Sequence, residues 1–191
     1  GDVPLLSKLG SSAWEKLKER TKEEIFQMAS ELIELYAQRK SLPGFKYAAD
    51  STEMRELEAS FPFQETPDQL RTVEDVKKDM EQPNPMDRLV CGDVGYGKTE
   101  VAVRAAFKAV CDQKQVAVLV PTTILAQQHY QTFSERMLPF SVRVEVMSRF
   151  GTAKNLKRIA ENVKAGKVDV LIGTHRILSK DVQFRDLGLL V

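Results

Sequence analysis

Several features that define other classes of protein are missing from this sequence. Its 191 residues include two cysteines, Cys91 and Cys111, which are too few for a disulfide framework and are expected to be free thiols in a reducing compartment. No apolar run approaches the roughly 18 residues of a membrane-spanning helix, and no signal peptide opens the chain. Internal repeats and low-complexity segments are absent too. These absences predict a cytoplasmic globular protein with no membrane partner.

An excess of charge of one sign is also missing. The 28 lysine and arginine residues nearly cancel the 27 aspartate and glutamate residues, which leaves a net charge of +1. Bulk charge therefore gives no support for nucleic-acid binding, and any DNA-binding surface would have to be a local patch.

The two ends of the chain predict a piece of a longer protein. The sequence begins at Gly1 without a methionine and ends in the apolar stretch Leu187–Val191. A stable protein rarely stops inside a hydrophobic strand. The length is sufficient for one sizeable α/β domain and an appendage.

Residues 1–59 predict an N-terminal segment with two helices. Residues 12–39 contain no glycine or proline, and apolar side chains recur there at helical spacing. The members of this apolar stripe are Trp14, Leu17, Ile25, Met28, Ala29, Leu32, Leu35 and Tyr36. The stripe either packs on its own domain or docks on another domain or partner. Leu42-Pro43-Gly44 is expected to end the helix, and a shorter helix is expected near 51–59.

Residues 60–191 predict an α/β domain. Phe61–Gln69 is expected to be an irregular stretch that leads into a helix ending near Met80. From Met86 onward, short apolar runs alternate with helical segments, which is typical of a parallel sheet covered by helices on both faces. The expected strands are 88–91, 115–120, 142–147, 168–172 and 188–191, and the expected helices are 98–110, 123–137 and 152–165.

A phosphate-binding loop is predicted at Gly92–Thr99, which fits the pattern G-x-x-x-x-G-K-[ST] between an expected strand and an expected helix. Its glycines would let the backbone take positive φ and bring amide groups to phosphate oxygens, beside the positive end of the helix. Lys98 would reach the β- and γ-phosphates, and the Thr99 hydroxyl would bind Mg²⁺. The alternative is a plain glycine-rich turn, but the position between strand and helix favours nucleotide binding.

Gln69 has two candidate roles. Thr66, Pro67 and Gln69 fit the N-cap, N1 and N3 positions of a helix, so Gln69 could simply close a capping box. Its amide could also pair with the N6 and N7 atoms of adenine. Phe61 and Phe63 could then supply an apolar or stacking surface for the base.

Four stretches of the sequence resemble motifs of superfamily 2 DNA translocases. They are Phe61–Gln69, Met86–Ala102, Pro121–Tyr130 and Ile172–Arg176. The chain resembles most closely the family of bacterial transcription-repair coupling factors, with branch-migration helicases of the RecG type as near relatives, and the resemblance runs through essentially the whole chain. It implies that residues 60–191 form most of a first RecA-like P-loop NTPase lobe. Residues 1–59, with their long amphipathic helix, would be the linker that precedes this lobe.

The resemblance also implies which residues form the sites. Nucleotide contacts would come from Phe63, Gln69, Gly92, Asp93, Val94, Gly95, Tyr96, Gly97, Lys98, Thr99 and Glu100. DNA-backbone contacts would come from Thr122, Thr123, Gln127, Arg149, Gly173, Thr174 and His175. Hydroxyl groups and loop amides suit this task, because phosphate contacts position a protein without reading sequence. Arg149 either binds a phosphate or is an exposed loop charge, and the lysines of 152–165 are interpreted as a solvated face.

The function implied by the resemblance is ATP-driven, Mg²⁺-dependent movement along double-stranded DNA that displaces stalled RNA polymerase and recruits excision-repair proteins. The modules of that family that bind polymerase and repair proteins would lie upstream of this chain. The acidic motif that holds Mg²⁺ and orients water would follow Val191, and a second lobe would supply an arginine finger. This chain alone is therefore expected to bind ATP or ADP weakly and not to hydrolyse it.

Three other functions are alternatives at this point. A fork-remodelling helicase of the same superfamily would carry a DNA-wedge module upstream of its motor lobe. A P-loop kinase or signalling GTPase would need an acceptor site or a guanine-reading Asn-Lys-x-Asp, and the sequence contains neither. A non-catalytic interaction fragment would need no complete catalytic set.

Overall fold

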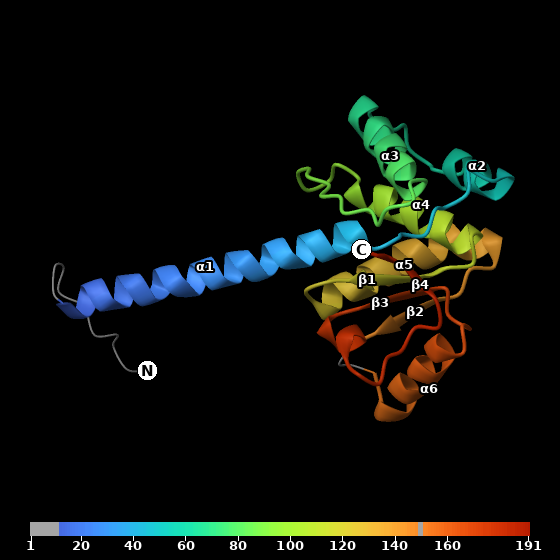
Figure 1. Cartoon of the computed structure of the whole chain (residues 1–191). Helices are drawn as coiled ribbons and strands as arrows, with labels where there is room; N and C mark the ends of the chain where they lie inside the picture. The colour runs from blue at the N-terminus through green and yellow to red at the C-terminus, as the bar shows by residue number, and fades with distance from the viewer. Residues whose placement is uncertain (1–11, 149–150) are drawn as a thin grey trace. The chain divides into compact units, whose positions relative to one another are not determined.

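The computed structural model describes residues 12–148 and 151–191 (Figure 1). Two compact units divide the chain, one ending at Pro43 and the other spanning Gly44–Val191. The sequence predicts a different boundary, near residue 60, because the motor-lobe motifs begin at Phe61. That boundary stays a prediction. Within the described ranges, no helix combines the length and the apolar character needed to cross a bilayer.

The first unit contains the long helix that the sequence predicts, α1, which spans Ser12–Ser41 and has 30 residues. Without glycine or proline, nothing interrupts its backbone ladder. An ion pair between Arg20 and Glu24, at 3.0 Å, adds local support across one turn. No residue of α1 is buried, and Leu32 and Tyr36 of the apolar stripe are each more than half exposed. Both interpretations of the stripe stay predictions.

The second unit is built on a parallel sheet. Its described strands are β1 Gln115–Leu119, β2 Val144–Met147, β3 Val170–Gly173 and β4 Leu187–Leu190, in the order β2-β3-β1-β4. All three pairings are parallel, and both Leu119 and Met147 are in register with Gly173. The carboxyl ends of β1, β2 and β3 therefore lie at one edge of the sheet, where open α/β sheets bind ligands.

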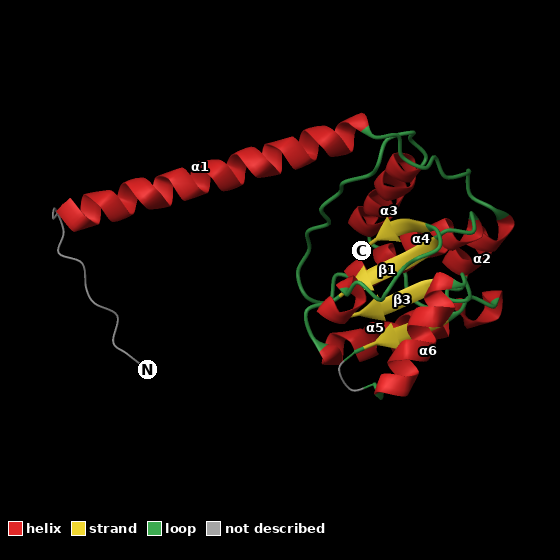
Figure 2. Ribbon diagram, turned by 60° about the horizontal axis from the view of Figure 1, so that its bottom comes forward, coloured by secondary structure: helices red, strands yellow, loops and turns green. Residues whose placement is uncertain are grey.

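Helices cover both faces of this sheet, as Figures 1 and 2 show. The helices of the second unit are α2 Thr52–Ala59, α3 Pro67–Met80, α4 Lys98–Cys111, α5 Thr123–Met137 and α6 Ala153–Lys164, with 3₁₀ turns at Leu138–Phe140 and His175–Leu178. Val116 and Val118 pack in one core with α4 and α5, whereas Ala117 between them packs in a second core with α6. The predicted RecA-like α/β fold is confirmed. The confirmed elements begin and end within two residues of their predicted limits.

Local hydrogen bonds explain where several of these helices begin. The Thr66 hydroxyl accepts the Gln69 amide, and the Gln69 side chain accepts the Thr66 amide, so the predicted capping box at α3 is confirmed. Thr122 and Thr152 cap α5 and α6 through their hydroxyls in a similar way.

The predicted strand at Arg88–Cys91 is wrong, because the structure assigns no strand there. A strand needs a hydrogen-bonded neighbour, and among the described residues β4 pairs only with β1. A cavity of about 340 Å³ is lined both by this segment, through Arg88 and Val90, and by Leu189 and Leu190 of β4. Apolar character alone was therefore not sufficient to make this segment join the sheet.

A buried lysine connects α4 to the segments around it. The Lys108 ammonium donates to the Ala48 carbonyl at 2.7 Å, to Asp50 at 2.9 Å and to Glu81 at 2.7 Å. All three of its donors are used, so the cost of burying the charge is offset. This lysine fixes the start of α2 and the end of α3 to the helix that carries the phosphate loop.

Candidate nucleotide-binding site

The predicted phosphate loop, Gly92–Thr99, enters α4 through backbone conformations that favour glycine. Gly95 has a φ of +88° and Gly97 a φ of +71°, and Gly97 is the N-cap residue of α4. A Cβ built on Gly95 would meet no atom within 4 Å, so the space beside the loop is open there. The loop therefore presents the partial positive charge of the helix N-terminus to an accessible space.

Lys98 lies against the backbone of this loop. Its ammonium donates to the carbonyl oxygen of Gly92 at 2.5 Å and to that of Asp93 at 2.7 Å. A phosphate oxygen would compete well with these carbonyls, because it adds a negative charge opposite the ammonium group. The lysine is thus held where a polyphosphate could take over its hydrogen bonds.

Most loop amides are not used by the protein itself. Throughout Gly92–Lys98, which the structure describes completely, only the Tyr96 amide has a backbone acceptor, the Asp93 carbonyl at 3.3 Å. No group of three or more His, Cys, Asp or Glu side chains placed to hold a metal occurs in the described residues. Binding of Mg²⁺ by the Thr99 hydroxyl stays a prediction.

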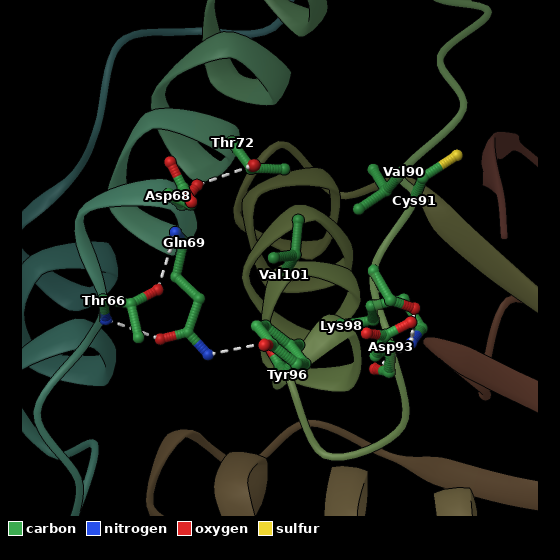
Figure 3. Close-up of a pocket in the computed structure, with 11 residues that line it drawn as sticks. Thr66, Asp68, Gln69, Thr72, Val90, Cys91, Asp93, Tyr96, Lys98 and Val101 are labelled. Atoms are coloured by element: carbon green, nitrogen blue, oxygen red, sulfur yellow. Dashed lines mark hydrogen bonds between the residues drawn. The ribbon is translucent and has the colours of Figure 1, made fainter.

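A pocket of about 390 Å³ opens beside the loop and α3 (Figure 3). Its lining residues are Thr66, Asp68, Gln69, Thr72, Val90, Cys91, Gly92, Asp93, Tyr96, Lys98 and Val101. This volume lies within the range of small-ligand sites. The loop is not folded shut, and the residues around the pocket fit a nucleotide.

Gln69 closes the capping box and also contacts the phosphate loop. Its Oε1 accepts the Thr66 amide at 2.7 Å, and its Nε2 donates to the Tyr96 carbonyl at 2.8 Å (Figure 3). Because an amide nitrogen carries two hydrogens, one donor is left for a base. Gln69 therefore bridges α3 and the loop, and adenine recognition by this residue stays a prediction.

Phe63 and Glu100 differ in their accessibility to a nucleotide. The Phe63 residue is 71% exposed, and its ring lies edge-on to Phe61 with the centroids 5.6 Å apart. Glu100 is buried, and its carboxylate pairs with Arg104 at 2.9 Å and with Arg136 at 2.8 Å. The Glu100 side chain is therefore engaged inside the protein, whereas Phe63 is free to meet a flat ring.

The candidate DNA-contact residues follow the carboxyl ends of β1 and β3. Leu119 is in register with Gly173, and the Val120 amide donates to the Gly173 carbonyl at 2.9 Å, so the two loops start side by side. Gln127 and His175 are exposed. None of these candidate residues lines the 390 Å³ pocket.

The other described candidates for DNA contact differ in accessibility, and Thr122 is exposed. Thr122 uses its hydroxyl to cap α5, and Thr123 is half-buried. Gly173 and Thr174 are buried, and a Cβ on Gly173 would lie 2.3 Å from a β2 carbonyl oxygen. Arg149 lies outside the described residues. These contacts stay predictions.

Sequence reasoning missed a group of charged residues behind the site. Arg104 is 3% exposed and pairs with Glu65 and Glu100. One signal could have indicated it: Glu100, Arg104 and Lys108 recur every fourth residue on a helix that is otherwise mostly apolar. Side chains at this spacing share a helix face, and charges on a buried face need partners.

The fold and the loop together define a RecA-like P-loop lobe. Residues 66–191 match the family model described as DEAD/DEAH box helicase. Because the match covers more than half of the sequence, the chain belongs to the DEAD/DEAH box helicase family.

Comparison with curated proteins gives closer relatives. The chain is 54% identical over 189 residues to the transcription-repair-coupling factor of Staphylococcus aureus (strain USA300), covering 99% of this chain and 16% of that protein. It is also 54% identical over 188 residues to the transcription-repair-coupling factor of Staphylococcus epidermidis, again covering 16% of the relative. The predicted resemblance to this family is confirmed, over a small part of its members' length.

Two solved structures share the fold. RecG bound to a three-way DNA junction is similar with a TM-score of 0.78 and 34% identity, over 93% of this chain and 24% of that one. A hypothetical ATP-dependent RNA helicase from Sulfolobus tokodaii is similar with a TM-score of 0.51 and 17% identity, over 68% of this chain and 35% of that one. The second likeness concerns the fold alone.

Replacing Gly97 should weaken nucleotide binding more than replacing Gly95. Both residues have positive φ, so alanine at either position adds a similar backbone strain of about 1 kcal/mol. A Cβ at Gly97 would lie 2.1 Å from the Gln69 Nε2, whereas a Cβ at Gly95 meets nothing. Gly97→Ala should therefore displace Gln69 and weaken ATP binding by about tenfold relative to Gly95→Ala, a loss of about 1.4 kcal/mol.

Titration of each variant with ATP measures this difference, and thermal unfolding checks that both remain folded. Equal affinities of the Gly97→Ala and Gly95→Ala variants would show that the contact between Gln69 and the loop does not matter for binding.

Proposed function

We propose that this chain is the ATP-binding part of a double-stranded DNA translocase that displaces stalled RNA polymerase and couples transcription to nucleotide-excision repair. The observation that carries the proposal is the open phosphate loop beside Gln69, in a chain 54% identical to transcription-repair-coupling factors over 99% of its length. The chain spans 16% of those relatives, so the activity belongs to the longer protein.

In this proposal the loop amides and the N-terminus of α4 hold the phosphates of ATP. Lys98 leaves the carbonyls of Gly92 and Asp93 and donates to the β- and γ-phosphates. Thr99 offers its hydroxyl to Mg²⁺, which neutralises charge on the phosphates. Gln69 and Phe63 contact the adenine base, since Gln69 is bonded to the loop and the Phe63 ring is exposed.

The loops after β1 and β3 would contact the backbone of double-stranded DNA. Gln127 and His175 are exposed there, and Thr122, Thr123, Gly173 and Thr174 supply hydroxyl or amide groups from the same edge of the sheet. Arg149 is proposed for the same surface from sequence alone. Contacts of this kind hold DNA without reading its sequence.

The partners of the longer protein would be RNA polymerase and excision-repair proteins, bound through modules outside this chain. We propose a cytoplasmic location, because the proposed activity acts on DNA and RNA polymerase. The apolar stripe of α1 would dock on such a neighbouring module.

A second candidate is a fork-remodelling or branch-migration helicase. The similarity to RecG, with a TM-score of 0.78, supports it. The identity to RecG is 34%, against 54% to the transcription-repair-coupling factors, and this difference favours the first candidate.

In the longer protein, Lys98→Ala should lower ATP hydrolysis by about 10²-fold or more and abolish translocation, because it removes a charge placed at the transferring phosphate. The lobe should stay folded, since the Lys98 side chain is exposed and bonds only loop carbonyls. Steady-state ATPase rates and displacement of a stalled polymerase measure the loss. Lys164→Ala, an exposed lysine at the end of α6, is the control. Normal polymerase displacement by Lys98→Ala would refute the role of this lysine.

By itself, this chain should bind adenine nucleotide weakly and not hydrolyse it. The described residues place no carboxylate cluster beside Thr99, so water activation and full metal binding need residues from elsewhere. Phosphate release with and without duplex DNA tests this expectation, and DNA-stimulated turnover by the purified chain would contradict it. If the chain also failed to bind ATP in a direct titration, it would act only as an interaction fragment.

In the longer protein, the double variant Gln127→Ala, His175→Ala should weaken duplex DNA binding similarly for all sequences and leave ATP affinity without DNA unchanged. Both side chains are exposed, and neither lines the nucleotide pocket. The measurement is fluorescence anisotropy with several unrelated duplexes. Gln131→Ala, on the same helix as Gln127 and bonded to Glu135, is the control. Loss of binding to one duplex only would argue against backbone contacts.

A further inference from the structure

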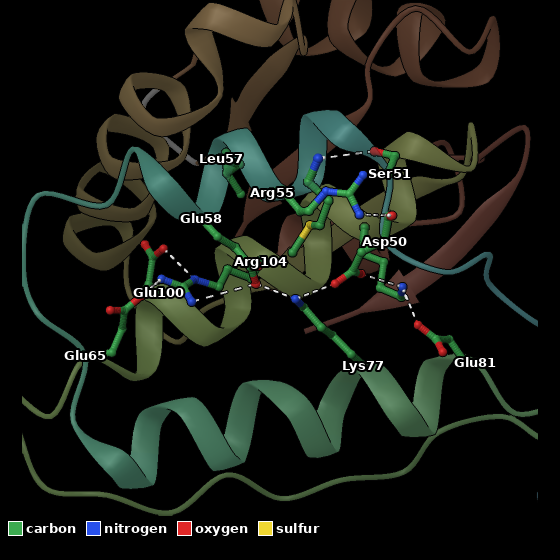
Figure 4. A network of polar contacts seen from close by, with 12 residues as sticks. Asp50, Ser51, Arg55, Leu57, Glu58, Glu65, Lys77, Glu81, Glu100 and Arg104 are labelled. Carbon is green, nitrogen blue, oxygen red and sulfur yellow. Dashed lines mark hydrogen bonds and ion pairs between the residues drawn. The ribbon is translucent and has the colours of Figure 1, made fainter.

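Two arginines, Arg104 and Arg136, connect Ser60–Gln69 (the 60–69 segment) to the helix that begins at the phosphate loop. Figure 4 shows Arg104 between Glu65 and Glu100. Arg104 of α4 donates to Glu65 Oε1 at 2.6 Å and to Glu100 Oε1 at 2.9 Å. The Arg104 side chain is 3% exposed, so these bonds are poorly screened by water and salt. They join the middle of the 60–69 segment to the first turns of α4.

Arg136 of α5 ties the start of the same segment. Its guanidinium donates to the Ser60 hydroxyl at 2.6 Å and to the Leu57 carbonyl at 2.9 Å. It also donates to both carboxylate oxygens of Glu100, at 2.8 and 3.2 Å. Glu100 is thus shared by the two arginines, and the end of α2, α4 and α5 are held together by one polar network.

Phe61 is held by the same two side chains. The guanidinium carbons of Arg104 and Arg136 lie over its ring, 5.4 and 5.5 Å from the centroid, which is the geometry of cation–π contacts. Phe63, two residues later, is 71% exposed. The backbone is therefore fixed on both sides of Phe63, and the Phe63 ring itself is left accessible.

The Arg104–Glu65 pair is charged at neutral pH. The hydrogen bond from Arg104 lowers the pKa of the Glu65 carboxyl. Burial alone would lower the pKa of Arg104, but its hydrogen bonds to Glu65 and Glu100 outweigh burial and raise that pKa. Both members of the Arg104–Glu65 pair therefore keep their charges wherever the protein is folded near neutrality.

A buried network of this kind is a poor source of stability. Replacing such ion pairs by apolar side chains of similar volume is often neutral or stabilising, because desolvation cancels much of the attraction. Ion pairs do, however, fix one arrangement of the groups they join. The effect expected of this network therefore concerns where the 60–69 segment lies relative to the loop.

We propose that Arg104 and Arg136 are positioning residues for the base of the bound nucleotide, because they fix the segment that carries Phe63 and Gln69 beside the phosphate loop. The inference rests on the proposed function, since it assumes ATP at that loop. It adds that preference for adenine over guanine depends on the Arg104–Glu65 pair, although neither side chain touches the base.

The test compares three ligands on the 191-residue chain by NMR titration, which measures weak binding: ATP, GTP and inorganic tripolyphosphate. Glu65→Ala should weaken ATP binding by about tenfold and leave tripolyphosphate affinity within about twofold, which lowers the ratio of ATP to GTP affinity. Arg104→Met, which removes the charge and keeps most of the volume, should do the same. Glu74→Ala, which breaks an exposed pair with Lys78 on α3, should change nothing.

A conservative variant separates positioning from folding. Glu65→Gln keeps an acceptor for Arg104, so it should retain more ATP affinity than Glu65→Ala at similar thermal stability. Should Arg104→Met not fold, Glu65→Ala still decides the question, because the Glu65 side chain is 25% exposed and leaves Glu100 with both arginines.

The possible outcomes are distinct. An unchanged ratio of ATP to GTP affinity in Glu65→Ala overturns the inference, and so does an equal loss of ATP and tripolyphosphate affinity. If the unmodified chain binds tripolyphosphate but does not prefer ATP to GTP, the inference fails while the phosphate loop keeps its proposed role. If the unmodified chain binds none of the three ligands, the proposed nucleotide-binding function itself fails.

Discussion

Positive φ at two glycines is the constraint on which the rest of the site depends. Gly95 and Gly97 let the chain turn into α4 while leaving most loop amides without a protein acceptor. Lys98, the next residue, bonds the carbonyls on the far side of the turn and so keeps its positive charge at the loop. A phosphate chain would meet amides, a helix N-terminus and an ammonium group in one place, and a shift of a single flexible side chain would complete the contacts.

Helix α4 gives this loop a rigid base. Nine of its residues are buried, and they include Val103 and Phe107 in the apolar core as well as Arg104 and Lys108 in polar contacts. A loop placed at the start of such a helix can hold ligand groups more accurately than a loop between mobile segments. The same helix packs against β1, whose carboxyl end leads into the candidate DNA loop. The nucleotide pocket and the candidate DNA loop after β1 thus share one supporting element.

The sequence predicted those features whose physical cause is local, and missed those that need a distant partner. The structure contains the Thr66–Gln69 capping box, the glycine loop and the periodic helices. Each of these features is determined by residues that are close together in the sequence. Arg88–Cys91 has the composition of a strand but lacks a described strand beside it, so its predicted state was wrong. The bond between Arg104 and Glu65 joins residues 39 positions apart, and no local pattern specifies such a pair. The resemblance implied a nucleotide contact for Glu100, whereas its pairs with Arg104 and Arg136 again join groups that no local pattern specified as partners.

Charged and apolar residues of α4 therefore have different tasks, although they alternate along the same helix. Phe107 and Val103 are removed from water and supply free energy of burial, which depends little on the direction of approach. Arg104 has donors in a fixed planar fork, so its bonds to Glu65 and Glu100 are satisfied in only a narrow range of positions of the 60–69 segment. Apolar packing can keep the lobe folded even when the 60–69 segment is slightly displaced. The ion pairs do not tolerate such a displacement, because their hydrogen bonds would be lost. Recognition of a base needs placement to within a fraction of an ångström, and among the contacts described here only the directional ones can provide it.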